Sequence, residues 1–453
     1  MEPFEISVVE ASARIRRGDL SPVALVESLI ARIESLEPTL RAWVTLDRDG
    51  ATQQAQDRQR ELERGTYRGP LHGIPVGVKD IFHTAGLRTT ACSRLYADFV
   101  PTRDATCVAR LREAGAIILG KTVTTEFATA DPPPTRNPWN AAHTPGGSSS
   151  GSAASVAARA CPAALGSQTA GSVLRPAAYN GIVGLKPTYG RLSRWGVFAV
   201  SWSLDTMGVL ARTVEDSSLL LQAMAGADPK DPASSTRPVP DYLAEMNGMD
   251  RPPRVGLVRE FFYGRATDEV RRHTDATAQR LAEAGAVVEE IRLPRSFYSV
   301  HPAHWAMARA ECASVHEGLF LQRREEYSPM IRRWIEEGFT IPATRYLQAQ
   351  RLRRRFQEEM ATVLERADVL LTPATTSEAP RDLTTTGNPI FQTPWTFAGL
   401  PAIAIPSGLS RSGLPLGVQL AAAPFAEGKL LAAARWCERE LGVRLAPPGL
   451  GLS

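Results

Sequence analysis

A segment of small residues, Gly146 to Pro176, constrains the fold of this chain more than any other feature. It reads GGSSSGSAASVAARACPAALGSQTAGSVLRP, in which two clusters of glycine and serine flank an Ala/Val-rich stretch, 152–160, that predicts a short buried helix. Glycine and serine at this density let backbone N–H groups approach a ligand closely. One segment can therefore supply hydroxyl nucleophiles and the backbone donors that stabilise the charge they create.

We interpret this segment as part of a folded core, although a Gly/Ser run is ordinarily a flexible linker. The run opens into an apolar stretch, and after Arg175-Pro176 the chain continues as NGIVGLKPTYGRLSRWGVFAV, which is typical of packed strand and turn. Long stretches of folding sequence lie on both sides of it. A linker would interrupt these patterns, and the patterns continue.

Composition describes a globular protein with an ample core. The 453 residues are 43% hydrophobic and 22% charged, and this length allows two or three ordinary domains or one large α/β unit. The net charge of +4 is spread along the chain, so it does not indicate a nucleic acid or an anionic membrane as a partner.

Cysteine usage and the N-terminal sequence favour a cytoplasmic location. The five cysteines, at 92, 107, 161, 312 and 437, show neither CxxC pairing nor zinc-like spacing with histidine, so we expect free thiols in a reducing compartment. The start, MEPFEISVVEASARIRRGD, lacks the features of a signal peptide. No apolar stretch approaches the roughly 18–20 residues of a membrane-spanning helix.

Hydrophobic periodicity predicts alternating helices and strands. The expected helices lie within 7–40, where Ser21-Pro22 is a start signal, and cover 51–64, 104–116, 268–284, parts of 303–366, and 427–441. The expected strands include 76–78, 117–119, 255–258, 287–291, 369–371 and one near 414–420. Strand, helix and strand follow one another over 76–119 and again over 255–291, which is typical of α/β proteins.

Two groups of basic residues are expected to have no chemical role when judged on local sequence. Lys121 follows a predicted strand and is expected to face solvent or to cap a helix. Arg351 to Arg355 alternate with glutamates further along the chain, which predicts an ion-paired, solvated helix face.

Seven short motifs are distributed along the chain. They are Gly73–Asp80, Gly146–Ser152, Gln168–Val173, Gly184–Arg191, Ser203–Gly208, Ala211–Asp216 and Thr393–Pro401. Together they resemble the amidase signature family of serine hydrolases, and only about 230–365 lacks a recognisable motif. The resemblance implies an α/β fold, with one large domain whose central mixed β-sheet is covered by helices on both faces.

The same resemblance implies a division of the single domain, 1–453. Residues 65–220 would form the signature core, 230–365 a variable region that shapes the substrate pocket, and 366–453 the closing strands and C-terminal helix.

The resemblance also implies the catalytic residues, motif by motif. Ser172 would be the nucleophile, Ser148 a bridging hydroxyl reached through a cis Gly147–Ser148 peptide bond, and Lys79 the base. Because free lysine has a pKa of about 10.4, burial beside uncharged serines has to lower the pKa of Lys79 before it can accept a proton. The oxyanion hole would consist of the backbone N–H groups of Thr169, Ala170, Gly171 and Ser172. Neither a cofactor nor a metal is expected.

The loop before the nucleophile departs from the family pattern at three positions. Gln168 stands where the family has Asp, Ala170 where it has Gly, and Leu174 where it has Arg, with Arg175 next in the chain. A carboxylate and a guanidinium that could pair across the loop are therefore missing, and Gln168 and Arg175 are the candidates that brace it instead. Ala170 is expected to keep a negative φ.

Other catalytic arrangements fit the sequence less well. Ser149 lies in a G-x-S-x-G pattern, with His273 or His316 as its base, but HTPGG precedes it instead of a buried strand. His143 lies close to the serines, yet the family's proton chemistry does not use histidine. A scaffold that kept the fold and lost activity is disfavoured because Lys79, Ser148 and Ser172 are all present.

Two functions remain within the family. The first is a free-standing enzyme that hydrolyses a carboxylic amide to an acid and ammonia or an amine, acting on a small-molecule linear amide, with no nucleic-acid or membrane partner and with self-association left open. The second is the glutamine-hydrolysing catalytic subunit of a tRNA-dependent amidotransferase. That subunit needs partner chains and an acidic residue shortly before the closing motif, which 388–392 does not offer, so we favour the first. The sequence does not name the amide, and Trp139, Trp195, Trp202 and Trp395 fit a pocket or core packing equally well.

Overall fold

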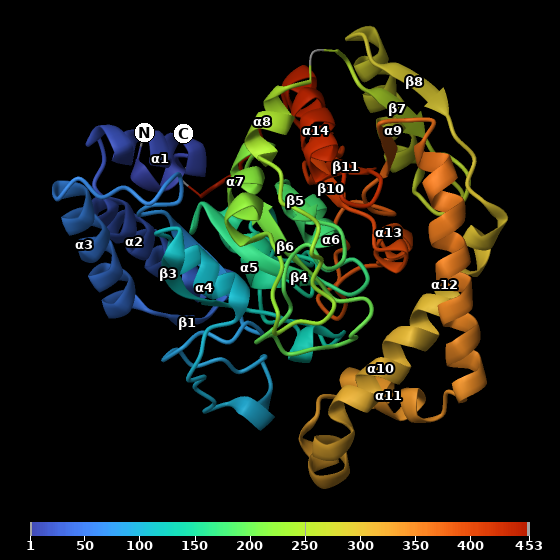
Figure 1. Cartoon of the computed structure of the whole chain (residues 1–453), viewed down its shortest axis with the longest axis horizontal. Helices are drawn as coiled ribbons and strands as arrows, with labels where there is room; N and C mark the ends of the chain where they lie inside the picture. The colour runs from blue at the N-terminus through green and yellow to red at the C-terminus, as the bar shows by residue number, and fades with distance from the viewer. Residues whose placement is uncertain (1, 250, 451–453) are drawn as a thin grey trace.

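Within residues 2–249 and 251–450, which the computed structural model describes, eleven strands form one mixed β-sheet (Figure 1). Their order across the sheet is β1-β3-β2-β4-β6-β5-β10-β11-β9-β7-β8. The strands are β1 (Trp43–Leu46), β2 (Pro75–Lys79), β3 (Ile117–Thr122), β4 (Ala163–Gln168), β5 (Val183–Lys186), β6 (Thr206–Ala211), β7 (Arg254–Leu257), β8 (Val287–Glu290), β9 (Val369–Pro373), β10 (Ala402–Leu409) and β11 (Pro415–Ala421).

Helices account for most of the remaining described residues. The α-helices are α1 (Val8–Arg17), α2 (Pro22–Leu40), α3 (Arg48–Glu63), α4 (Thr106–Glu113), α5 (Ser150–Ala157), α6 (Leu174–Asn180), α7 (Val214–Met224), α8 (Tyr242–Asn247), α9 (Asp268–Glu283), α10 (Val300–Arg323), α11 (Pro329–Phe339), α12 (Ala343–Leu364), α13 (Thr393–Ala398) and α14 (Glu427–Leu441). The 3-10 helices are η1 (Pro3–Glu5), η2 (Arg94–Tyr96), η3 (Glu126–Ala128), η4 (Arg295–Ser299) and η5 (Arg324–Glu326). No helix in these ranges combines the length and apolarity needed to cross a bilayer.

Both βαβ units expected from the sequence are present. β2 and β3 pair in parallel across α4, and β7 and β8 pair in parallel across α9. β4 continues the parallel arrangement on the other side of β2. Every residue of β2, β3 and β4 is buried, as expected of parallel strands covered on both faces, whose sequences are apolar runs without alternation. The ends of β2 and β4 therefore meet in the interior of the molecule.

Helices cover both faces of the sheet, which confirms the expected fold class. α5 and α6 pack on each other and on the strands around β4 and β10, while α7, α8 and α14 form a second packed group. The small residues of α5 allow it to lie directly against the backbone of the sheet. A Cβ atom at Gly151 would stand 2.2 Å from the carbonyl oxygen of Ala42, so no larger residue fits at this crossing.

The region 230–365 supplies β7, β8 and the helices α8 to α12. Figure 1 shows α10, α11 and α12 together at the lower right, extending beyond the sheet. The expectation of a solvated arginine face on α12 is correct for Arg355, which pairs with Glu359 at 2.7 Å. It is wrong for Arg353, which is buried and donates from Nε to the carbonyl oxygen of Phe397 at 2.7 Å. This arginine joins α12 to α13.

Candidate active site

Lys79 is the last residue of β2 and has no solvent-exposed surface. Its Nζ is hydrogen-bonded to Ser148 Oγ at 2.8 Å and to Ser167 Oγ at 2.8 Å, and it lies 3.5 Å from the carbonyl oxygen of Ser167. Burial lowers the pKa of Lys79 to about 7, whereas the negative charge of Asp205 acts in the opposite direction. The lowered pKa that the proposed chemistry needs is therefore present.

The surroundings of Nζ suit an uncharged amine. A neutral amine has two N–H donors and one lone pair, and Ser167 offers two acceptors, its hydroxyl and its carbonyl oxygen. The lone pair is then directed to the remaining neighbour, Ser148, whose hydroxyl can donate to it. Ser167 thus orients the amine so that it can accept a proton from Ser148.

Ser148 and Ser172 lie on two segments that contact each other. The Gly147–Ser148 peptide bond is cis, as expected. The backbone N–H of Ser149 donates to the carbonyl oxygen of Ser172 at 3.3 Å, which joins the two Gly/Ser clusters directly. Within the described contacts no hydrogen bond links the hydroxyls of Ser148 and Ser172, and such catalytic bonds often form only when substrate binds. The structure therefore shows the Lys79–Ser148 contact and places the Ser172 segment beside it.

The loop between β4 and α6 contains residues 169–172, whose N–H groups are the predicted donors of the oxyanion hole, and we call it the oxyanion loop. The four N–H groups of residues 169–172 make no hydrogen bond within the described part of the chain, so they are available to a ligand. Two carbonyl groups of the same loop are held by other elements. His304 Nε2, from α10, lies 2.8 Å from the carbonyl oxygen of Thr169, and Thr396 Oγ1, from α13, donates to that of Ala170 at 2.8 Å. The carbonyls are anchored while the donors remain free.

Gln168 takes the place of the missing carboxylate. Its Oε1 accepts from the backbone N–H groups of Val173 and Leu174 at 2.9 and 3.0 Å, and its Nε2 donates to Thr396 Oγ1 at 3.0 Å. Ala170 is not among the residues with positive φ, as expected. Of the two bracing candidates, Gln168 braces the loop. The side chain of Arg175 instead donates to the carbonyl oxygen of Gly147 and to Thr386 Oγ1.

Asp205 is a buried carboxylate next to this loop. It accepts from Thr169 Oγ1 at 2.5 Å and from the backbone N–H groups of Val200 and Ser201 at 2.8 and 3.0 Å. Three donors around one carboxylate favour its ionised form, and burial acts against them by raising its pKa. Asp205 thus fixes Thr169 and provides a negative charge near Lys79.

A cavity of about 150 Å³ opens in front of Ser172. Its lining includes residues of the oxyanion loop and, from α10 and α11, His304, Trp305, Met330 and Trp334. The indole rings of Trp305 and Trp334 pack edge to face, with centroids 5.1 Å apart. Burial lowers the pKa of His304 to about 4, so its ring is neutral. None of the four tryptophans considered from the sequence lines this cavity.

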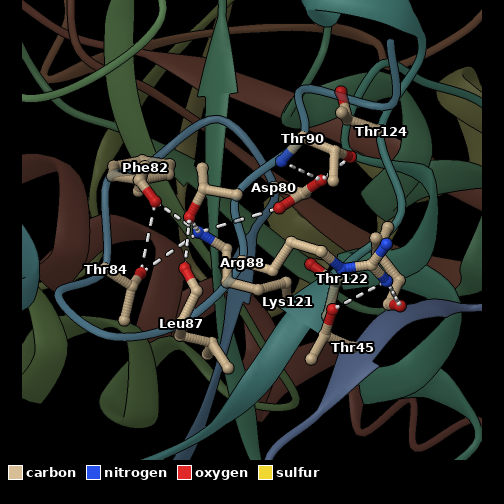
Figure 2. A network of polar contacts seen from close by, with 12 residues as sticks. Thr45, Asp80, Phe82, Thr84, Leu87, Arg88, Thr90, Lys121, Thr122 and Thr124 are labelled. Carbon is tan, nitrogen blue, oxygen red and sulfur yellow. Dashed lines mark hydrogen bonds and ion pairs between the residues drawn. The ribbon is translucent and has the colours of Figure 1, made fainter. Parts of the chain in front are cut away.

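Lys121 is buried, and the expectation that it faces solvent or caps a helix is wrong. It lies in β3, and Figure 2 shows its amino group surrounded by the segment that follows β2. Lys121 Nζ donates to Thr84 Oγ1 at 3.1 Å, to Thr89 Oγ1 at 3.0 Å and to the carbonyl oxygen of Phe82, and it lies 3.8 Å from Asp80 Oδ1. The sequence suggested a Gly120-Lys121 turn after the strand 117–119, but β3 continues through these residues beside β2.

The other candidates lie apart from this site. Ser149 Oγ is hydrogen-bonded to the carbonyl oxygen of Ser167 and contacts no histidine among the described residues. His273 is bonded to Ser407, His316 to the hydroxyl of Tyr327, and His143 to the carbonyl oxygen of Ala379. Each histidine therefore has a structural partner, and none is placed to activate a serine.

Four residues of the site were not predicted: Ser167, Asp205, His304 and Thr396. Ser167 carried a signal, because it lies two residues before the expected oxyanion hole on the same strand. Asp205 and Thr396 lie within two of the sequence motifs and His304 lies in none, but all three reach the loop only through tertiary packing.

Comparison with known proteins agrees with this geometry. Residues 24–431 match the Amidase family model. One glutamyl-tRNA(Gln) amidotransferase subunit, from Carboxydothermus hydrogenoformans, is 38% identical, over 99% of this chain and 100% of its own. Among solved structures, the peptide amidase of Stenotrophomonas maltophilia superimposes with a TM-score of 0.87 at 32% identity, covering 98% of each chain. A chain from a vestigial complex related to an s-triazine catabolic enzyme gives 0.90 at 31%, covering 97% of this chain and 99% of that chain.

These relatives correct the expectation about partners. We expected a small-molecule amide substrate, no nucleic acid, no membrane and at most self-association. The curated relatives are instead subunits of an enzyme named for glutamyl-tRNA(Gln), and they match over nearly their whole length. The error has a physical reason. A weak, dispersed net charge describes one chain alone, whereas in a multisubunit enzyme other chains can contact the nucleic acid. With the motifs, the site and the full-length match in agreement, this chain belongs to the amidase family.

Proposed function

We propose that this amidase-family enzyme hydrolyses a linear carboxamide through an acyl-enzyme on Ser172, with Ser148 and Lys79 as the proton route. The observation that carries the proposal is the buried Lys79 amine, with a pKa of about 7, in hydrogen-bond contact with Ser148. A charged amine could not accept a proton, and a serine hydroxyl alone is too weak a nucleophile for an amide.

In the proposed reaction Ser172 Oγ attacks the amide carbon, and its proton passes through Ser148 to Lys79. The carbonyl oxygen becomes an oxyanion, for which the unengaged N–H groups of residues 169–172 are the donors. The proton then returns through Ser148 to the leaving nitrogen, because the C–N bond breaks only when nitrogen is protonated. Water hydrolyses the resulting ester by the same route and regenerates Ser172.

Labelling and turnover test these roles together. A fluorophosphonate probe is expected to modify Ser172 in the native protein and to leave Ser172→Ala unmodified, as mass spectrometry of the labelled peptide can show. Ser172→Ala is also expected to lose amide hydrolysis. A Ser172→Ala variant with native turnover would overturn the proposal. Ser149→Ala is the control, because Ser149 is the nucleophile of the competing G-x-S-x-G arrangement, and this variant is expected to keep its turnover.

Between the two functions considered from the sequence, the curated relatives favour the glutamine-hydrolysing subunit of a tRNA-dependent amidotransferase. We propose this role for the chain. The test assays ammonia release from glutamine by the chain alone, and glutamyl-tRNA(Gln) amidation after addition of the other subunits of a relative's amidotransferase. Glutamine-dependent amidation is expected. Hydrolysis of other amides with no reaction on glutamine in either assay would contradict this role.

The region 230–365 is proposed to govern which amide is accepted. Support comes from the cavity, since side chains of α10 and α11 line it together with the oxyanion loop. The division into signature core, variable region and closing segment remains a prediction, and so does the cytoplasmic location, for which the five unpaired cysteines are the support.

A further inference from the structure

Glu311 is a buried carboxylate in the middle of α10, where it is 5% exposed. Its Oε2 accepts from the backbone N–H of Ser203 at 3.0 Å and from the hydroxyl of Ser201. Its Oε1 accepts from the hydroxyl of Ser203 and from that of Tyr346 at 2.8 Å. Four groups therefore donate to this one carboxylate, and three of them belong to two neighbouring serines.

Ser201 connects Glu311 to a second buried carboxylate. The hydroxyl of Ser201 donates to Glu311, and its backbone N–H donates to Asp205 Oδ2 at 3.0 Å. The backbone N–H of Val200 donates to the same oxygen at 2.8 Å, and that of Asp205 donates to the carbonyl oxygen of Ser201 at 3.0 Å. The segment 200–205 is thus a closed turn whose internal bonds tie its position to that of Asp205.

Asp205 continues the connection to the oxyanion loop, because its Oδ1 accepts from Thr169 Oγ1 at 2.5 Å. An unbroken series of buried hydrogen bonds therefore runs from Glu311 through Ser201 and Asp205 to Thr169. Hydrogen bonds are stronger in a protein interior than in water, so each link of this series resists displacement.

The helix α10 thus holds Thr169 at two points. His304 Nε2 lies 2.8 Å from the carbonyl oxygen of Thr169, and Glu311 reaches the hydroxyl of the same residue through the segment 200–205. His304 and Glu311 are seven residues apart, which places them on one face of the helix, about 10 Å apart along its axis. The carbonyl of Thr169 and the N–H of Ala170 share one planar peptide unit, so this double hold sets the direction of a predicted oxyanion donor.

The donor side of the loop has no support of its own. The N–H groups of residues 169–172 make no hydrogen bond within the described part of the chain, so no bond to them fixes their directions. A misdirected donor forms a weaker hydrogen bond, and loss of one oxyanion donor typically costs about 10²–10³ in rate. Anchors on the carbonyl and on the side chain of Thr169 hold the loop and leave its donors free for a ligand.

We propose that Glu311 is a positioning residue for the oxyanion loop, acting through Ser201, Asp205 and Thr169. Glu311 does not line the described cavity, so its effect on the reaction passes through the loop. The loop geometry matters most when the carbonyl oxygen becomes an oxyanion, because the donors bind the transition state more strongly than the substrate. Loss of Glu311 should therefore lower kcat and leave KM nearly unchanged. This inference rests on the proposed function.

The first test replaces the carboxylate. Glu311→Met removes the acceptors and keeps a side chain of similar length. With glutamine and with butyramide as substrates, kcat is expected to fall about ten- to thirtyfold and KM to change about twofold or less. An unchanged kcat, or a rise in KM alone, would overturn the inference.

Glu311→Gln is the conservative variant and is expected to retain most of kcat. Its amide oxygen can still accept from Ser201 and from the backbone N–H of Ser203. The hydroxyls of Ser203 and Tyr346 can rotate to accept from the new amide nitrogen. Inhibition by butyraldehyde gives a second readout, because addition of Ser172 to its carbonyl forms a tetrahedral adduct whose oxygen meets the same donors. The inhibition constant is expected to rise in Glu311→Met by about the factor by which kcat falls.

A double variant separates positioning of the loop from general support of the fold. Thr169→Val breaks the last link of the series and keeps the shape of the side chain. If Glu311 acts through this link, Glu311→Met is expected to add about twofold or less to the loss of kcat in Thr169→Val. Losses that multiply in the double variant would show that Glu311 acts by another route and would overturn the inference.

Glu427→Met is the matched control. Glu427 is also a buried glutamate, and its Oε1 accepts from the backbone N–H of Thr188 at 2.9 Å, but it lies in α14 and its described hydrogen bonds do not reach 169–172 or 200–205. This variant is expected to lose stability and to keep its kcat, and an equal loss of kcat would overturn the inference. Should Glu311→Met not fold, Ser201→Ala removes only the hydroxyl that joins Glu311 to the segment. Its kcat is expected to fall about threefold or more, and an unchanged kcat would overturn the inference.

The two proposals fail in different ways. Without labelling of Ser172 and without turnover, the proposed function fails, and crystal structures of the native protein and of Glu311→Met still decide the role of Glu311. Asp205 is expected to be displaced from Thr169 in the variant, and unmoved residues 169 and 200–205 would overturn the inference. With labelling and turnover but native kcat in Glu311→Met, only the role of Glu311 fails.

Discussion

At the scale of single residues, the site depends on the protonation of one amine. Lys79 has no exposed surface, and its closest polar neighbours are the uncharged Ser148 and Ser167. Desolvation therefore outweighs the attraction of Asp205 and brings the pKa of Lys79 to about 7. A fully exposed lysine on the same strand would be protonated and useless as a base.

The pH dependence of amide hydrolysis should report this pKa. Below pH 7 Lys79 is protonated and cannot accept a proton, so kcat/KM is expected to rise with pH and to level off above about pH 7. The measurement is a pH profile of kcat/KM from pH 5 to 9. A profile that is flat across pH 6–8 would contradict the role of Lys79 as base, and Lys79→Met is expected to abolish turnover at every pH.

Asp205 gives a second prediction about the same profile. Its negative charge stabilises the charged form of Lys79, so Asp205→Asn is expected to lower the pKa of Lys79 further. The acidic limb of the profile then moves to lower pH. The plateau is expected to fall as well, because asparagine keeps only one acceptor oxygen, for which Thr169 Oγ1 then competes with the backbone N–H groups of Val200 and Ser201. An acidic limb that stays in place or moves to higher pH would refute the claim that the charge of Asp205 raises the pKa of Lys79.

At the scale of elements, the oxyanion loop is short and held from outside. It joins β4 to α6, and side chains of α10 and α13 bind its two carbonyl groups. This fixes the directions of the peptide planes, because each carbonyl points toward its donor and each N–H points away. The loop contains Gly171, where an added Cβ would stand 2.7 Å from Gln392 Oε1. Gln392, which directly precedes α13, therefore leaves no space for a side chain at position 171.

Removing the anchor on α13 should slow the chemical step. Thr396→Val keeps the shape of the side chain but removes the donor to Ala170 and the acceptor of Gln168 Nε2. We expect kcat to fall roughly three- to tenfold with KM little changed, the size of one hydrogen bond. Steady-state kinetics measures this. Thr393→Val on the same helix, whose hydroxyl donates to Pro389, is the control, and an equal effect there would argue against a specific anchor.

The pair of Lys121 and Asp80 belongs to the same scale, since it fixes the segment after β2. Lys121 is buried and holds three acceptors of residues 82–89, while Asp80 Oδ2 accepts from both the backbone N–H and the hydroxyl of Thr90. Asp80 directly follows β2 and bonds to Thr90, whereas Lys79, the last residue of β2, bonds to Ser148. The pair therefore stabilises the strand end that carries the proposed base.

Breaking this pair should cost stability. Lys121→Met leaves the Asp80 carboxylate buried without a counter-charge, and the free energy of unfolding is expected to fall by about 3–5 kcal/mol. Urea denaturation measures this. The double variant Lys121→Met, Asp80→Asn is expected to recover part of the loss because no charge is left uncompensated. A loss below about 0.5 kcal/mol for Lys121→Met would show that the pair is not stabilising.

At the scale of the whole molecule, the variable helices close the site that the signature motifs begin. α10 packs on α11, α12 and α13, and side chains of α10 and α11 line the cavity together with the oxyanion loop. His304 joins the two parts directly, since it both lines the cavity and binds the carbonyl oxygen of Thr169. A change in how α10 packs would therefore alter the shape of the cavity and the position of the loop together.

The local sequence pattern was sufficient to predict most helices and strands. The start of α2 at Ser21-Pro22 and the full length of α14, 427–441, follow from capping and apolar spacing, which act over a few residues. Both βαβ units were predictable because in each a short strand pattern, an amphipathic helix pattern and a second short strand pattern follow one another along the chain. Lys121 and Arg353 were misjudged for one reason: a charged side chain usually lies in solvent, and only its tertiary neighbours can reverse that.

The sequence by itself determined the family, the fold class and the identity of Lys79, Ser148 and Ser172 as candidates, because these are recorded in short motifs with fixed spacing. Tertiary structure alone decided how the altered loop is held, through Gln168, His304 and Thr396, and that the series of hydrogen bonds from Glu311 reaches Thr169. These properties depend on which distant atoms lie within about 3 Å of one another and on how much water they exclude. Neither quantity is encoded in any local stretch of residues.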